Sequence, residues 1–208
     1  MDELFVMDTE KTDIVSEKGV ICVKCRITVP VFKSEEAFAG RANAFYGGIR
    51  ERFAKFCASR LLKKAQKRPP EITAPYGAVM EPRVTFSDAG YVSVIIDTHV
   101  YDGVRRGNTV RISQVWNRSD GVLESADTFV PPRARCAVLD NIRAQARDKY
   151  ESGAAFYKPD PDTRIINAFC AKNFYLVSQG VAFYFEAGAI SHSAFPEVFI
   201  VKDINILQ

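Results

Sequence analysis

The chain has 208 residues, of which 47% are hydrophobic and 25% are charged, as in an ordinary soluble globular protein. The 28 basic residues exceed the 25 acidic residues by only three, which is too small an excess to predict a nucleic-acid partner. No run of about 18 apolar residues is present, so the sequence predicts no membrane span. A chain of this length can bury a core that folds without a disulfide or a metal.

Two features bear on the cellular compartment. The N-terminus is acidic and lacks the apolar stretch of a secretory signal. Five cysteines are an odd number, which favours a reducing compartment. We therefore expect a cytoplasmic location, or an extracytoplasmic one if a leader has been removed.

The first 17 residues are predicted to be poorly ordered, and residues 18–208 to form a single module with sub-parts at about 18–125 and 126–208. Residues 20–31 alternate between apolar and polar side chains and predict a half-buried strand. Cys22 and Cys25 of this strand match C-x-x-C, but residues three apart on a strand face opposite sides. We expect a buried Cys25, an outward Cys22 and no redox or metal role.

A long amphipathic helix is predicted for residues 34–64, with Ser34 as its N-cap. The apolar stripe that indicates it has spacings of three and four. It consists of Phe38, Ala42, Phe45, Ile49, Phe53, Phe56 and Cys57.

The remaining pattern predicts a β-meander over 83–125 and a second helix from Pro131–Pro132 to about Tyr150. A short helix capped by Asp162 and a strand at 198–201 are also predicted. These elements indicate an α+β fold with a mainly antiparallel sheet, a long N-terminal helix and a second helix packed on it.

The stretch N-F-Y-L-V-S-Q-G-V-A-F-Y-F at 173–185 predicts a hairpin with apolar residues on both faces. Exposure of five aromatic rings would leave an apolar patch larger than soluble monomers usually tolerate. We therefore expect the hairpin to be buried within a sheet, beneath the helix of residues 34–64.

The candidate catalytic residues are few. Asp97 and His99 share one face of a strand, and a carboxylate beside a histidine can orient a general base. No G-x-S-x-G sequence or histidine-paired cysteine signature supplies a nucleophile, and His192 is the only other histidine. We predict no enzyme, no catalytic residue, no cofactor and no metal site, with a hydrolase that uses Asp97 and His99 as an alternative.

The hairpin, followed by F-P-E-V-F-I-V-K-D-I at 195–204, resembles the C-terminal part of the extracytoplasmic module of RsiV-like anti-sigma factors, which sense lysozyme. The same module is attached to PdaC-like peptidoglycan deacetylases. The family hairpin typically reads N-F-Y-L-T-D-D-G-L-V-F-Y-F. A family loop, Y-T-G-G-A-H-G-N, corresponds to residues 101–108. The resemblance spans about residues 18–205 and is most specific at 173–203.

This resemblance implies a bacterial cell-envelope module that binds or senses a ligand and does not catalyse. The partner would be a protein or, as an alternative, a cell-wall glycan bound by an accessory domain. The loops at 101–108 and 186–195 are the expected contact regions. Their candidate binding residues are Tyr101, Asp102, Arg105, Arg106, Asn108, Ser191 and His192.

Two departures from the family pattern concern the ligand. The loop at 101–108 carries Arg105 and Arg106 where the family has small residues and a histidine, and the loop at 186–195 lacks the family's prolines and tyrosines. Common animal lysozymes are strongly basic, and a binder of such a protein needs negative charge. We therefore expect a ligand other than basic lysozyme.

Overall fold

The computed structural model describes residues 4–16 and 18–202, which form two compact units. Unit 1 comprises the described residues up to Arg83, together with Ile96–Gly107 and Arg118–Gly121. Unit 2 comprises Val84–Ile95, Asn108–Asn117 and the described residues from Val122 onward. The division differs from the predicted sub-parts 18–125 and 126–208, because two segments of the meander cluster with the C-terminal half.

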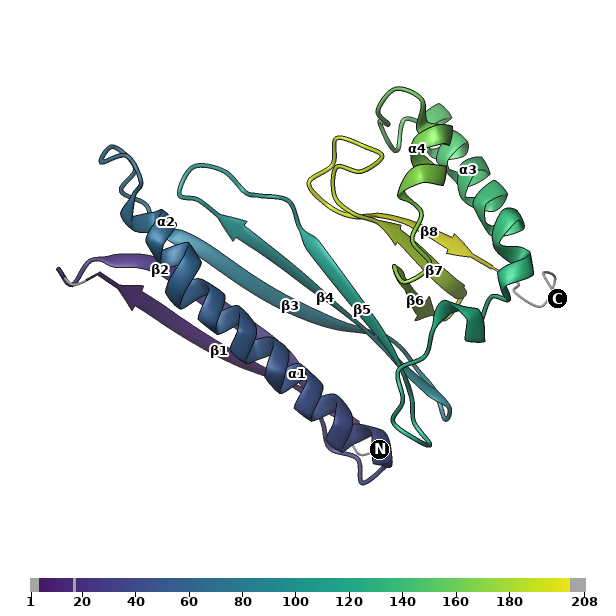
Figure 1. Ribbon diagram of the computed structural model, residues 1–208, viewed down its shortest axis with the longest axis horizontal. Coiled ribbons are helices and arrows are strands. Elements are labelled where there is room, and N and C mark those ends of the chain that lie inside the picture. The colour runs from purple at the N-terminus through teal and green to yellow at the C-terminus, as the bar shows by residue number, and fades with distance from the viewer. Residues whose placement is uncertain (1–3, 17, 203–208) are drawn as a thin grey trace. The chain divides into compact units, whose positions relative to one another are not determined.

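The strands form two sheets and confirm the α+β class with mainly antiparallel pairing (Figure 1). The first has the order β1-β2-β3-β4-β5, and the second the order β6-β7-β8. The parallel exception is β2 with β3, which the long helix connects. The strands are β1 (Phe5–Val15), β2 (Ile21–Phe32), β3 (Tyr76–Ser87), β4 (Tyr91–Tyr101), β5 (Val110–Asn117), β6 (Phe174–Val177), β7 (Gly180–Phe185) and β8 (Glu197–Val201).

Two predictions for the N-terminal region are wrong. Residues 5–15 are not poorly ordered but form β1, which pairs with β2 along its whole length, whereas residues 1–3 and 17 lie outside the described residues. Cys22 is buried and does not point outward. The cause is a shift in the β1–β2 register, where Ile14 faces Val23 and Val15 faces Ile21, so that Cys22 is the extra residue of a bulge.

The long helix of unit 1 is confirmed as a continuous run of α1 (Ala37–Phe56), a π-helical turn (Cys57–Leu61) and α2 (Leu62–Gln66). Its N-cap is Glu36 instead of Ser34, whose Oγ accepts a hydrogen bond from the Glu36 N–H. The helix packs on β2 (Figure 1). Its buried residues are Phe38, Ala39, Ala42, Tyr46, Ile49, Cys57, Leu61 and Ala65.

Unit 2 contains the second predicted helix, α3 (Arg135–Glu151), preceded by a 3₁₀ turn that Pro132 begins. The short helix α4 (Pro161–Ala168) is also present, but its N-cap is Asp160, in the left-handed region, instead of Asp162. α3 covers one face of the second sheet, where the Lys149 amine donates to Val198 O at 2.8 Å. This face contributes Phe174, Leu176, Val181, Phe183, Phe185, Phe199 and Val201 to the core.

The aromatic hairpin is therefore buried, as predicted, but the helix that covers it is α3 and not the helix of residues 34–64. Its opposite face is also closed within unit 2, because Tyr175 and Tyr184 pack with Ile95. The Arg111 guanidinium lies 5.8 Å from the centre of the Tyr175 ring and 5.7 Å from that of Tyr184. The rings form the core of unit 2 and do not line an open groove.

Candidate functional site

The loop at 101–108 was predicted to contact a ligand, and within unit 1 it is held by its own hydrogen bonds. Asp102 Oδ1 accepts bonds from the N–H groups of Val104 at 3.0 Å and Arg105 at 2.9 Å. These two bonds lower the pKa of the Asp102 carboxyl. The Tyr101 hydroxyl donates to Gly103 O at 2.8 Å. Asp102 and Tyr101 therefore shape the loop.

The side chains that this loop presents to solvent include Val104, which is 64% exposed, and Arg105, which is 85% exposed, and Arg106 and Asn108 are also exposed. Arg105 lies 3.7 Å from Asp102, and Arg106 forms a backbone bridge with Tyr101. Gly103 has a φ of +88°, and a Cβ there would lie 2.9 Å from Ala74 O. The loop is thus braced at its base and offers an apolar side chain beside a cation, a combination common at protein interfaces.

The catalytic alternative finds little support in the geometry of unit 1. The Asp97 carboxylate lies 3.5 Å from the Arg83 guanidinium and so forms an ion pair with a cation. Burial and the nearby Arg106 and Arg26 lower the pKa of His99. A neutral imidazole can act as a base, but Arg106 and Arg26 disfavour the imidazolium that forms when it takes up a proton.

The second predicted loop, residues 186–195, belongs to unit 2 together with Asn108. Ser191 is 2% exposed, and its hydroxyl donates to Glu197 Oε1 at 3.0 Å, so it fixes the loop and does not face a ligand. His192 is exposed. Asn108 Nδ2 lies 3.5 Å from Ala187 O, and the next residue, Thr109, donates its N–H to Ala194 O at 2.7 Å. The structure therefore brings Asn108 together with the loop of Ser191 and His192.

Two exposed phenylalanines beside this loop were missed by sequence reasoning. Tyr157 pairs with Ser191, which places the segment containing Phe156 next to the loop. Phe156 is 74% exposed, and Phe195, on the loop itself, is 51% exposed. Such rings are frequent interface anchors. No sequence signal separates them from the many core phenylalanines, because tertiary packing decides which rings are exposed.

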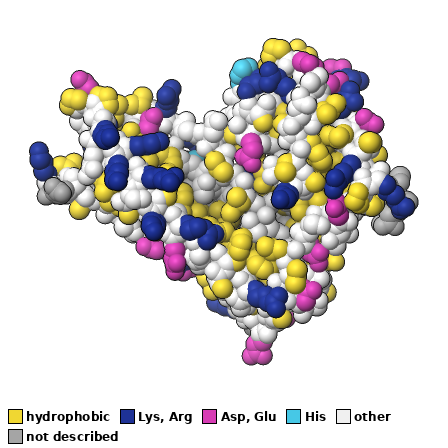
Figure 2. All heavy atoms as spheres, viewed as in Figure 1, with side chains coloured by type: hydrophobic (Ala, Val, Ile, Leu, Met, Phe, Trp, Pro, Cys, Tyr) yellow, Lys and Arg dark blue, Asp and Glu magenta, His cyan; other side chains and the backbone are white. Residues whose placement is uncertain are grey.

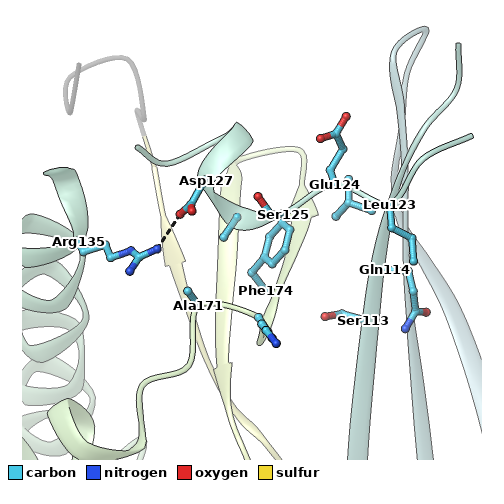
Figure 3. A pocket seen from close by; sticks show the side chains of 12 residues that line it. Ser113, Gln114, Leu123, Glu124, Ser125, Asp127, Arg135, Ala171 and Phe174 are labelled. Carbon is cyan, nitrogen blue, oxygen red and sulfur yellow. Dashed lines mark hydrogen bonds and ion pairs between the residues drawn. The ribbon is translucent and has the colours of Figure 1, made fainter. Parts of the chain in front are cut away.

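Unit 2 also contains a cavity of about 370 Å³ beside β5 and β6 (Figure 3). Its wall includes Phe174, and the Ser113 hydroxyl points from β5 toward it. At the other side Arg135 forms an ion pair with Asp127 at 2.9 Å. An apolar wall with a few polar groups is the usual form of a small-molecule site.

The strongest charged surface is on the long helix of unit 1, and it too was missed. Residues 37–68 contain nine of the 28 basic residues but only one acidic residue, Glu51, so this segment carries a charge of +8 and the rest of the chain −5. Figure 2 shows lysine and arginine side chains gathered over this helix. We call its exposed cations the cationic flank. They are Arg41, Arg52, Lys55, Arg60, Lys63, Lys64 and Lys67.

The cationic flank forms because pairs of its cations lie three or four residues apart, as Arg52 and Lys55 or Lys63 and Lys67 do, and these spacings return to nearly the same side of a helix. Arg60 lies within the π-helical turn at Cys57–Leu61, and Lys63, Lys64 and Lys67 follow it. The spacing was readable in the sequence, but the net charge of +3 conceals it.

The described residues contain no group of three or more His, Cys, Asp and Glu side chains placed to hold a metal ion. Over residues 4–16 and 18–202, no helix is both long and apolar enough to cross a membrane.

Comparison of the sequence with family models and with curated proteins finds no match. Comparison of the fold finds solved relatives. A member of the DUF3298 family from Bacteroides fragilis superposes with a TM-score of 0.59 at 11% identity, covering 95% of this chain and 90% of that one. A DUF3298 family protein from Pseudomonas aeruginosa gives 0.60 at 13% identity, covering 97% and 92%. The chain therefore has the fold of these DUF3298 family proteins along almost its whole length.

Proposed function

We propose that this chain is a non-catalytic module, related to the RsiV-like sensing module, that binds an acidic protein surface. The segregation of charge carries this proposal: residues 37–68, which are the long helix of unit 1 and the two residues after it, bear +8 while the rest of the chain bears −5. Complementary charge steers association and excludes partners of the same sign. The ligand is therefore an acidic protein rather than a basic lysozyme.

The cationic flank is suited to this role because its side chains are available. The ion pairs recorded for α1 involve Arg50, which contacts Asp8 at 2.6 Å and lies outside the flank. The braced loop at 101–108 adds exposed Arg105 and Val104 in the same unit. A preformed loop loses little conformational freedom on binding, which favours affinity.

Binding is tested with two immobilised polypeptides of opposite charge, poly-L-glutamate and a basic animal-type lysozyme. We expect the chain to bind poly-L-glutamate, and to bind it more weakly as salt is raised because salt screens exposed charges. We expect no binding to the basic lysozyme. Binding to the lysozyme with none to poly-L-glutamate would refute the proposed charge of the ligand.

A pair of charge-reversed variants locates the contact. In the flank variant, Arg52→Glu, Lys55→Glu and Lys63→Glu are combined. The control combines Arg133→Glu, Arg147→Glu and Lys202→Glu, which are exposed cations of unit 2, and changes the net charge equally. The flank variant should lose at least tenfold in affinity and the control much less. Equal losses would mean that net charge, and not this surface, governs binding.

Absence of catalysis is tested separately with peptidoglycan fragments as substrates. We expect no turnover by the chain and no change in the variant His99→Ala. Turnover that this substitution abolishes would establish the hydrolase alternative in place of the binding module.

A second candidate, binding of a small polar ligand such as a cell-wall sugar, is favoured by the cavity of about 370 Å³ beside Phe174. Titration with N-acetylglucosamine oligomers, followed by the fluorescence of Trp116 on β5, would test it. Saturable binding that Ala171→Leu removes by narrowing the cavity would favour this candidate.

A further inference from the structure

Two cysteines that are distant in sequence meet in the core of unit 1. Cys25 lies on β2, and Cys57 begins the π-helical turn of the long helix. Their Sγ atoms are 3.2 Å apart, and the residues are 6% and 0% exposed. The two sulfur atoms would need to approach by only about 1.2 Å to reach the length of a disulfide bond.

The fold holds this pair together from both sides. Cys25 is on the face of β2 that includes the buried residues Val23 and Ile27, and the helix packs on this strand. Cys57 follows the last residue of α1, and Leu61 and Ala65 continue its buried row at spacings of four. The meeting of the two thiols therefore follows from the packing of helix on strand.

We propose that Cys25 and Cys57 are a site of covalent modification, which becomes an intrachain disulfide when a small-molecule disulfide such as oxidised glutathione is the oxidant. The cross-link would tie the long helix to β2.

The reaction consists of two thiol–disulfide exchanges. The Cys25 thiolate attacks one sulfur of the oxidant, the oxidant's S–S bond breaks, and one glutathione thiolate leaves. The Cys57 thiolate then attacks the Cys25 sulfur of the mixed disulfide and expels the second glutathione thiolate. The two cysteine sulfurs are oxidised and the oxidant is reduced to two thiols, which take up the two protons.

The surroundings of the two thiols shift their pKa values in opposite directions. A hydrogen bond with Cys57 lowers the pKa of Cys25, whereas this hydrogen bond and burial raise the pKa of Cys57. Within the native packing Cys25 is therefore the better nucleophile of the two. Because both thiols are buried in the folded chain, the oxidant reaches them during folding or transient opening, and native packing then brings the sulfurs together.

The other three cysteines are placed differently. The Cys22 thiol lies 3.5 Å from Val20 O, to which it donates a hydrogen bond. Cys136 and Cys170 are exposed and belong to unit 2. A test can therefore isolate the pair by replacing these three residues with alanine.

The test uses Cys22→Ala/Cys136→Ala/Cys170→Ala, refolded in a buffer of reduced and oxidised glutathione. Alkylation followed by intact mass measurement should show a monomer about 2 Da lighter than the reduced chain and with no alkylated cysteine. The same protein carrying Cys25→Ala in addition should remain fully alkylated at Cys57. The oxidised protein should also melt several degrees higher than its reduced form.

Full alkylation of both Cys25 and Cys57 under oxidising conditions would overturn the proposal. If the triple variant fails to fold, peptide mapping of the unaltered chain after the same treatment decides the matter. A linked peptide that joins Cys25 to Cys57 supports the cross-link, and its absence, or pairing with any other cysteine, contradicts it.

Discussion

Replacement of Phe199 by alanine tests whether the aromatic hairpin and its neighbouring strand form a core. Phe199 is fully buried on β8, its ring lies 5.7 Å from that of Phe185 in an edge-on arrangement, and the Lys149 amine is 4.4 Å from its centre. Truncation of a buried phenylalanine typically costs about 3–5 kcal/mol. Loss of the edge-on ring pair places the value in the upper half of this range, at about 4–5 kcal/mol.

The assay is urea unfolding followed by the fluorescence of Trp116, the one tryptophan of the chain, which is 3% exposed and belongs to unit 2. The matched control is Phe156→Ala, because Phe156 is 74% exposed and its truncation should change the free energy of unfolding by less than about 0.5 kcal/mol. A loss below about 1 kcal/mol for Phe199→Ala, or equal losses for the two variants, would refute the assignment of these rings to a core.

Three further predictions concern unit 2 and the loop of unit 1. Gly180→Ala should destabilise the chain by several kcal/mol in the same assay, because a Cβ at its φ of +145° would lie 2.2 Å from Val201 O; retention of stability would contradict the turn geometry. The pKa of His99 is lowered in the folded chain, so stability should fall as pH decreases from about 6.5 toward that lowered value, and His99→Gln should remove this part of the pH dependence measured by thermal unfolding. Asp102→Ala should loosen the 101–108 loop, seen as faster amide hydrogen exchange at Val104, while unchanged exchange would mean that Asp102 does not brace it.

The strand at 20–31 was predictable because it follows a simple period of two, with apolar side chains on a buried face, and the hairpin was predictable because two apolar runs flank Ser-Gln-Gly. The helix that covers the hairpin could not be predicted. The residues of the hairpin are apolar on both faces, so any amphipathic helix can cover it, and the choice of α3 over the longer helix depends on the tertiary fold.

β1 was missed because its residues include Asp8, Glu10, Lys11 and Asp13, which are poor strand formers and are exposed in the structure. It nevertheless pairs with β2 along one of its two sides, and charges are usual on an edge strand. Cys22 was misplaced because a bulge interrupts the alternation that the sequence displays.

In the candidate sites, too, features set by neighbouring residues in the chain were predictable, and features set by tertiary packing were not. The hydrogen bonds of Asp102 are local to its loop, and the polarity of that loop was readable. The spacing of the cationic flank was readable as well. The position of Phe156 depends on the pairing of Tyr157 with Ser191, and the meeting of Cys25 with Cys57 depends on helix packing. Neither of these two has a signature in a single sequence.

The salt dependence of poly-L-glutamate binding tests the central claim most directly. The affinity of the unaltered chain should fall steeply between low and physiological ionic strength, and the variant Arg52→Glu/Lys55→Glu/Lys63→Glu should bind weakly with a much shallower dependence. The same steep dependence in that variant would contradict the account, because the charges of the long helix would then have no part in recognising the ligand.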